Sequence, residues 1–199
     1  MEVKSLLTSR FIPTMTLLST LTLFTGYTYG METSVQNEDV TENNVMQQAI
    51  KKANSELLCA AQTGNLAKIK QLIMQAIANL NTLNDNQSTP LILAASEGRK
   101  DIVECLIKAN VNLNAINKYG YNALMLAARD GYTDCAKLLI EAGADLEVAN
   151  ANGSTALLLA VKNDNTDIAK MLINAGAKMN VGYECILHYL FLALYRPAH

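Results

Sequence analysis

The chain has 199 residues and a formal net charge of −2, and half of its residues are apolar. This length suits one domain of moderate size with tails, and the weak negative charge argues against a nucleic-acid ligand. With no tryptophan and three phenylalanines, the core has to be built from Ala, Leu, Ile and Met, which favours closely packed helices over an aromatic-rich β-sandwich.

The N-terminal segment, residues 1–30, has the order of a secretory signal peptide. Lys4 and Arg10 precede an uncharged apolar stretch at 11–24, and small residues follow up to Gly30. A basic region, an apolar region and a small-residue cleavage site are typical of such signals. The apolar stretch is shorter than the roughly 20 residues of a membrane-spanning helix. We therefore expect an exported protein, periplasmic or secreted. The alternatives are an uncleaved membrane anchor, the only case in which membrane contact is expected, and a cytoplasmic protein with a loosely structured extension.

Residues 31–54 begin as an acidic, polar segment and are expected to form a linker. From about Val45 the spacing of apolar residues becomes helical. Because the end units of a repeat stack need a polar outer face, this second part of the segment is interpreted as a helix that caps the domain that follows.

From residue 55 onward, the sequence repeats itself with a period of 33 residues. Positions that occupy the same place in successive units form a column, and five columns keep this step. They are Leu91, Leu124, Leu157 and Leu190; Ala94, Ala127, Ala160 and Ala193; Leu106, Leu139 and Leu172; Asn84, Asn117 and Asn150; and Leu80, Leu113, Leu146 and Met179. A fixed period of this length is typical of stacked repeats, because one short helix pair cannot bury its apolar face alone.

Each unit reads as two short helices followed by a turn. An N-cap residue precedes the first helix, a residue that tolerates the left-handed conformation ends it, an acidic residue opens the second helix, and Asn or Gly closes it. In unit order these residues are Thr89, Asn122 and Thr155; Gly98, Gly131 and Asp164; Asp101, Asp134 and Asp167; and Asn110, Gly143 and Gly176. The polar stretch between units, such as residues 117–120, reads as a β-turn.

The pattern of a β-turn and two helices in 33 residues resembles the ankyrin repeat, most closely in STPLILAASEGRKDIVECLIKANVNLNAIN. The resemblance implies an all-α solenoid of stacked helix-turn-helix units with β-turn or hairpin loops. Its units are residues 55–84, 85–117, 118–150 and 151–183, with residues 184–199 as a truncated fifth repeat or a C-terminal cap helix. The histidine usual after the family's Thr-Pro-Leu is replaced by Ile92, Met125 and Leu158. One extra residue between Ile73 and Ala78 predicts a bulged or extended end of the first unit's second helix.

No pattern of catalytic, cofactor-binding or metal-binding residues emerges, so we expect no enzymatic activity, no cofactor and no small-molecule substrate. The two histidines, His188 and His199, lie near the C-terminus, and His188 occupies an N-cap column. The cysteines lack zinc-ligand spacing. Cys105 and Cys135 fall in core columns, and we expect every cysteine except Cys185 to be inaccessible to a thiol reagent.

The resemblance implies protein binding through the concave face formed by the turn tips and the exposed side of the first helices. Tyr119 and Tyr121 stand out, because tyrosine is enriched at interfaces. The alternative is that both are ordinary loop residues, which for Tyr121 includes packing on the neighbouring turn. The expected contact residues are Asp85, Asn86, Ser88, Ser96, Glu97, Lys118, Tyr119, Tyr121, Arg129, Asp130, Asn152, Ser154, Lys162 and Asn163. The leading hypothesis is an exported, non-enzymatic binding protein with a protein partner, and a membrane-anchored form or a regulator of an enzyme are alternatives.

The C-terminal stretch YECILHYLFLALY, residues 183–195, is strongly apolar. It is too short to span a bilayer. If no further helix covers it, it has to fold onto the fourth unit, meet a partner, or mediate self-association; truncation of a longer parent sequence would leave the same pattern.

Overall fold

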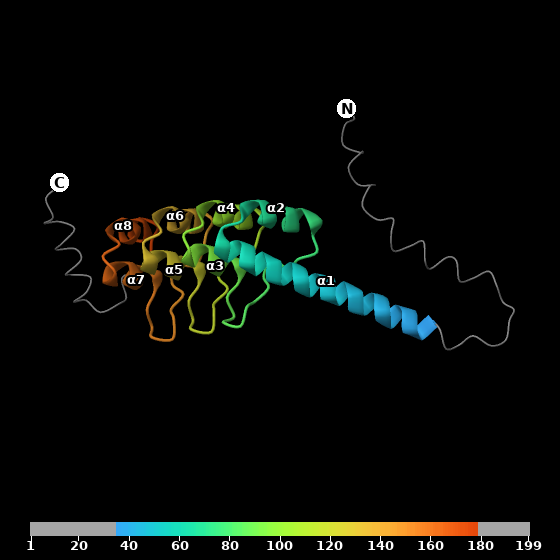
Figure 1. Cartoon of the computed structure of the whole chain (residues 1–199). Helices are drawn as coiled ribbons and strands as arrows, with labels where there is room; N and C mark the ends of the chain where they lie inside the picture. Colours follow the sequence, from blue (N-terminus) through green and yellow to red (C-terminus); the bar gives the residue numbers. More distant parts are fainter. Residues whose placement is uncertain (1–34, 179–199) are drawn as a thin grey trace, which may run out of the picture. The chain divides into compact units, whose positions relative to one another are not determined.

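The computed structural model describes residues 35–178, with side chains from residue 43 onward. It contains eight helices and no strand within this range, so the described part of the chain is all-α, as the sequence predicts (Figure 1). Residues 1–34 and 179–199 lie outside it, and with them lie the expected signal segment and C-terminal helix. The repeats belong to the unit formed by Asn44–His199, and all packing described below is within that unit.

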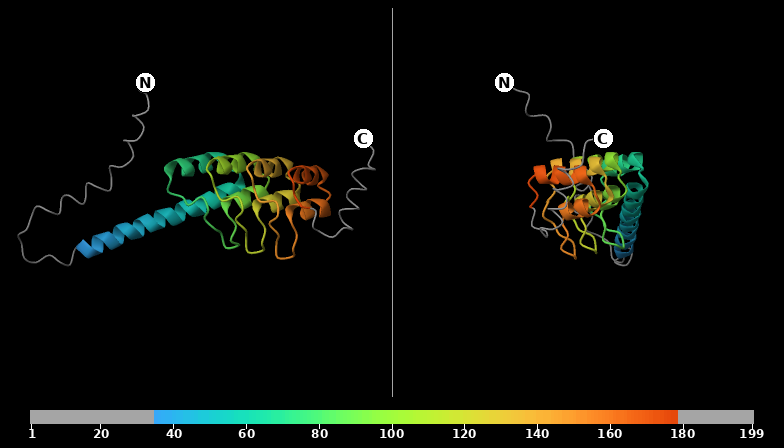
Figure 2. Two further views of the ribbon diagram at one scale, coloured as in Figure 1. Left: turned by 180° about the vertical axis from the view of Figure 1, so that it is seen from behind. Right: turned by 90° about the vertical axis from the view of Figure 1, so that its left-hand side faces the viewer.

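The helices alternate between two rows. The first helices of the four units are the end of α1 (Val35–Thr63), α3 (Pro90–Ser96), α5 (Ala123–Asp130) and α7 (Ala156–Lys162). The second helices are α2 (Leu66–Gln75), α4 (Lys100–Lys108), α6 (Thr133–Glu141) and α8 (Thr166–Asn174). From α3 on, each first helix packs on its own second helix and neighbouring first helices pack on one another. The second helices pack in series from α2 to α8. The loops between units project together on one side of the two rows (Figures 1 and 2).

The core runs through all four units as the period requires. Leu91, Leu124 and Leu157 are 2%, 0% and 1% exposed, and they belong to one continuous apolar cluster. The column of Ala94 and Ala127 is fully buried as well, because a methyl side chain lets neighbouring first helices approach closely. The expectation that the repeated leucines form a shared core is therefore confirmed.

Local signals set the helix boundaries where the sequence places them. Thr89, Asn122 and Thr155 each adopt an extended conformation and accept a hydrogen bond from the backbone N–H three residues later. This satisfies one of the amide groups that the first turn of a helix leaves without a partner. Gly131 then ends α5 in the left-handed conformation, with φ 81°, as its position predicts.

The first unit differs from the others at both ends. Helix α1 is described from Val35 onward, so residues 35–44 of the segment expected to be a linker are helical; α1 contains no Gly or Pro that would break a helix before Thr63. At the other end, α2 has ten residues where α4, α6 and α8 have nine. This confirms the expected extension, and Ala76 ends the helix in the left-handed conformation with φ 51°.

Candidate protein-binding surface

An asparagine organises each turn between units. The side-chain oxygen of Asn117 accepts hydrogen bonds from the backbone N–H groups of Tyr119 at 2.9 Å and Tyr121 at 3.0 Å. Asn84 and Asn150 make the same two bonds, at 2.9 Å each, in their own turns. We call these turns the tips; they comprise residues 84–88, 117–121 and 150–154.

Each tip is closed by backbone hydrogen bonds as well. The N–H of Asn117 donates to the carbonyl of Tyr121, and the N–H of Gly120 donates to the carbonyl of Asn117, both at 2.9 Å. The residue before the end of each tip, Gly120 in this case, has a positive φ of 79°. Because the asparagine satisfies amide groups that would otherwise face water, the tips are ordered without being part of a sheet.

Hydrogen bonds also join neighbouring units. The N–H of Lys118 donates to the carbonyl of Asn86 at 3.0 Å, which links the first two tips. Nearer the second helices, the side chain of Asn81 accepts from the N–H of Asn112 at 3.0 Å, and Asn114 accepts from Asp145 at 2.9 Å. Glu147 continues this series by accepting from the N–H of Lys178 at 2.7 Å. These bonds fix the register between units.

At the centre of the stack, the second tip meets the end of α5. The guanidinium of Arg129 lies over the ring of Tyr121, 5.5 Å from its centroid. Two hydrogen bonds, at 2.7 and 2.9 Å, join the same guanidinium to both carboxylate oxygens of Asp130. The hydrogen bond to Asp130 is the largest cause of a raised pKa for Arg129, so its charge is stabilised. The structure thus brings together three residues that the sequence placed on a candidate surface, which we call the Tyr121–Arg129 cluster.

Tyr119 lies beside this cluster on the same tip and is the most open of the aromatic side chains that the structure describes. It is 54% exposed, and the ammonium of Lys118 lies 5.0 Å from the centroid of its ring. Tyr121, in contrast, is half-buried and packs against the core cluster. Tyr121 therefore has a packing role in the fold in addition to its contact with Arg129.

The other expected contact residues fall into three groups. Asp85, Asn86, Glu97, Lys118, Asp130, Asn152, Lys162 and Asn163 are exposed, and Ser96 is half-buried with its hydroxyl bonded to the carbonyl of Leu93. Ser88 and Ser154 are only 5% and 4% exposed, so their selection as contact residues was wrong. They share a column with Tyr121. At this position the short serine side chain is covered by its surroundings, whereas the longer tyrosine side chain extends beyond them.

Charge is distributed unevenly along this face. The second unit contributes the acidic residues Asp85 and Glu97, whereas the third contributes Lys118 and the fourth Lys162. In the third unit, Arg129 and Asp130 form an ion pair, so their charges offset one another. The face therefore changes from acidic to basic along the stack without a strong field of either sign.

The sequence reading missed two exposed apolar residues at the base of the tips. Leu83 is 54% exposed and Ile116 is 51% exposed. Both directly precede an asparagine of the tip column, and this shared position is the signal that could have revealed them. They enlarge the apolar part of the tip surface.

The cysteines correct one expectation. Cys135 is buried and Cys105 is half-buried, but Cys59 is exposed. Cys59 shares its column with Leu93, which is half-buried, and with Leu126 and Leu159, which are buried; among the described residues, no preceding helix pair covers Cys59 in the first unit. Cys185 lies outside the described residues.

The described residues lack both a cluster of metal ligands and a membrane-spanning helix. Between residues 35 and 178, no group of three or more His, Cys, Asp and Glu side chains is placed to hold a metal ion. Over the same range, no helix combines the length and apolar character needed to cross a bilayer.

Repeated helix pairs with a row of ordered tips define a helical-repeat solenoid, a class of protein that offers a continuous face to partners. A family model described as ankyrin repeats (3 copies) matches residues 23–115, 57–150 and 114–183. The chain belongs to the ankyrin-repeat family, as the resemblance implied. A comparison with curated proteins found no match. Ankyrin repeats are protein-interaction modules in general, and the family is typically non-catalytic.

Proposed function

We propose that this protein binds a protein partner through the face made by the tips and the ends of the first helices. The observation that carries this proposal is the Tyr121–Arg129 cluster, with Tyr119 exposed beside it. Tyrosine and arginine are among the side chains that most often dominate the binding energy of an interface. A preorganised cluster also loses less conformational entropy on binding than free side chains would.

The cluster has the properties of an interface centre. Two hydrogen bonds to Asp130 and the stacking on Tyr121 fix the position of Arg129. The opposite charges around it favour a partner with a mixed polar and apolar surface over a highly charged ligand. Leu83 and Ile116 add exposed apolar area at the base of the tips.

The proposal is tested by replacing the cluster and comparing binding. Full-length protein with a photo-crosslinking amino acid at Asn152 would capture partners from the native source, with and without Tyr119→Ala and Arg129→Ala. We expect both substitutions to weaken binding of the captured partner by at least about tenfold, the effect of a typical hot-spot residue. Lys137→Ala, on the exposed side of α6 in the other helix row, is the matched control and should leave binding unchanged. Equal capture by all variants would refute the proposed surface, and an enzyme among specific partners would favour a regulatory role.

We further propose that the protein is exported. This rests on residues 1–30 alone, where two basic residues precede an uncharged apolar stretch. N-terminal sequencing of protein from fractionated cells tests it: a start near residue 31 supports release, whereas an intact Met1 in the membrane fraction supports the anchored alternative. An intact Met1 in the soluble cytoplasmic fraction would contradict export.

A further inference from the structure

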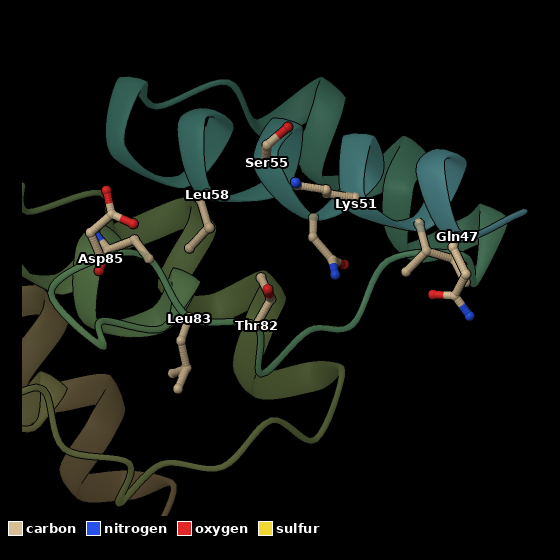
Figure 3. Close-up of a pocket in the computed structure, with 10 residues that line it drawn as sticks. Gln47, Lys51, Ser55, Leu58, Thr82, Leu83 and Asp85 are labelled. Atoms are coloured by element: carbon tan, nitrogen blue, oxygen red, sulfur yellow. The ribbon is translucent and has the colours of Figure 1, made fainter. Parts of the chain in front are cut away.

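A groove opens between helix α1 and the loop that leads into the first tip (Figure 3). Its volume is about 480 Å³, which is within the range of roughly 300–1,000 Å³ found for ligand sites. The residues that matter below are Ile50, Lys51 and Leu58 on the helix wall, and Thr82, Leu83 and Asp85 on the loop wall.

The groove lies where a stack of identical units would have another tip. The second tip pairs with the first through the N–H of Lys118, which donates to the carbonyl of Asn86. Asp85 occupies the same column as Lys118. In the first unit, helix α1 continues where a preceding tip would be expected, and the N–H of Asp85 makes no hydrogen bond within residues 35–178. The first tip therefore has an unused backbone donor at a residue that lines the groove.

The walls of the groove combine apolar and charged side chains. Leu83 is 54% exposed, and Ile50 and Leu58 are half-buried, so apolar surface lines the groove from both sides. Lys51 and Asp85 stand on opposite walls (Figure 3), and neither forms an ion pair with a described residue. A ligand that matches the free N–H, the apolar walls and Lys51 has to offer a backbone acceptor, an apolar side chain and a carboxylate.

We propose that this groove binds an extended peptide segment of a protein partner, which takes the place of the missing tip. A carbonyl of the peptide accepts the hydrogen bond from Asp85, an apolar side chain packs against Leu58 and Leu83, and an acidic side chain pairs with Lys51. Adding a strand-like segment to an unpaired edge in this way lets the backbone supply affinity and the side-chain sites supply specificity. The inference rests on the proposed function in that the partner is a protein, and it names the form in which that partner binds.

A pair of substitutions at one position isolates the backbone donor. Asp85→Pro removes both the N–H and the carboxylate, whereas Asp85→Ala removes the carboxylate only. Asp85 is the second residue of the turn closed by the hydrogen bond from Gln87 to Asn84, 2.8 Å long, and proline is favoured at that position. Urea denaturation of both variants establishes that the stack is intact. If Asp85→Pro proves unstable, Leu83→Ser and Lys51→Glu probe the groove in its place.

The probe is a library of linear twelve-residue peptides displayed on phage and selected on the full chain. The affinity of each selected peptide is then measured by fluorescence anisotropy. We expect selected peptides to carry an acidic and an apolar residue, and to bind Asp85→Pro roughly tenfold more weakly than Asp85→Ala, because one hydrogen bond is lost and its carbonyl is left unpaired. Leu83→Ser and Lys51→Glu should also weaken binding.

Two results would overturn the inference. One is that the library yields no binding peptide. The other is that the selected peptides do not distinguish Asp85→Pro from Asp85→Ala, or are unaffected by Leu83→Ser and Lys51→Glu where Asp85→Pro is unstable. Peptides that respond only to Arg129→Ala would leave the proposed function standing and reject the groove, whereas peptides that respond to the groove variants and not to Arg129→Ala would support the groove; the crosslinking experiment above tests the proposed function separately.

Discussion

The ring of Tyr132 lies so close to Gly98 that a Cβ atom built on the glycine would overlap it. Tyr132 comes from the following unit, at the residue before its second helix, and Gly98 follows the end of α3. The same relationship recurs between Asn165 and Gly131, where the asparagine side chain also donates to the last carbonyls of α5. Each unit therefore covers the end of the first helix of the unit before it.

This contact predicts a difference between two glycine substitutions. Gly98 and Gly153 have φ values of 64° and 70°, but nothing lies within 4 Å of a Cβ at Gly153. Gly153→Ala should lower the free energy of unfolding by about 1–2 kcal/mol, the cost of a left-handed residue with a side chain. Gly98→Ala should cost roughly 1 kcal/mol more, because the Tyr132 ring has to move. Urea denaturation measures both; equal losses would show that the ring moves freely.

The N-cap of α5 offers a stabilising substitution. The side chain of Asn122 is fully buried, its oxygen accepts from the N–H of Met125 at 2.8 Å, and its Nδ2 has no hydrogen-bond partner among the described residues. Threonine fills the same column at Thr89 and Thr155, where the hydroxyl caps the helix. Asn122→Thr should therefore raise the free energy of unfolding by about 1 kcal/mol, since it removes an unpaired buried donor.

Asn122→Ala is the control for this prediction. It removes both the unpaired Nδ2 atom and the capping oxygen, and loss of a cap typically lowers the free energy of unfolding by about 1 kcal/mol. Thermal or urea denaturation should therefore place the threonine variant above the wild type and the alanine variant at or below it. A threonine variant no more stable than the wild type would contradict the proposed cost of the buried amide.

The second tip should depend on one side-chain oxygen. Asn117→Ala removes the acceptor of two backbone N–H groups, those of Tyr119 and Tyr121. We expect a loss of roughly 1–2 kcal/mol in the free energy of unfolding, and faster hydrogen exchange at both amides. Asn117→Asp retains the acceptor and should restore protection. Unchanged exchange in the alanine variant would mean that the backbone bonds alone hold the tip.

The rate at which each cysteine reacts with a thiol reagent should follow the burial of its side chain. Burial is the main cause that raises the pKa of the Cys135 thiol to about 11, while Cys59 is exposed. Because thiolates are the reactive form, a thiol reagent at pH 8 should label Cys59 rapidly and Cys135 only on unfolding. Cys59→Ser and Cys135→Ala assign the signals by mass spectrometry. Labelling of Cys135 in native protein as fast as that of Cys59 would contradict the buried position.

The same pKa shift predicts a pH dependence. A thiol whose pKa is raised on folding retains its proton in the folded state where the unfolded state has lost it, so folding stability decreases with pH. The free energy of unfolding should fall between about pH 9 and 11, by at most roughly 3 kcal/mol, and less so in Cys135→Ala. Parallel curves for the two proteins over this range would refute the contribution of Cys135.

The sequence by itself determined the fold of this protein. The 33-residue period, the caps at Thr89 and Thr155 and the buried leucines of the Leu91 column were all readable, because each depends on neighbours a few residues away or on one repeated contact. The extended second helix of the first unit followed from a single insertion in that period. Repetition makes such inferences secure, since every unit meets the same surroundings.

Only the tertiary structure decided which polar and end-unit positions are open. Ser154 is covered although it shares a column with the more exposed Tyr121, and Cys59 is exposed although Leu126 and Leu159 of its column are buried. The pairing of Arg129 with Tyr121 and the groove beside Asp85 likewise depend on side-chain size and on where the row of tips begins. A periodic sequence specifies the features that each unit shares with the next. The exposure of a side chain, in contrast, depends on which residues of the neighbouring unit pack against it, and the first unit has a different neighbour from the inner units.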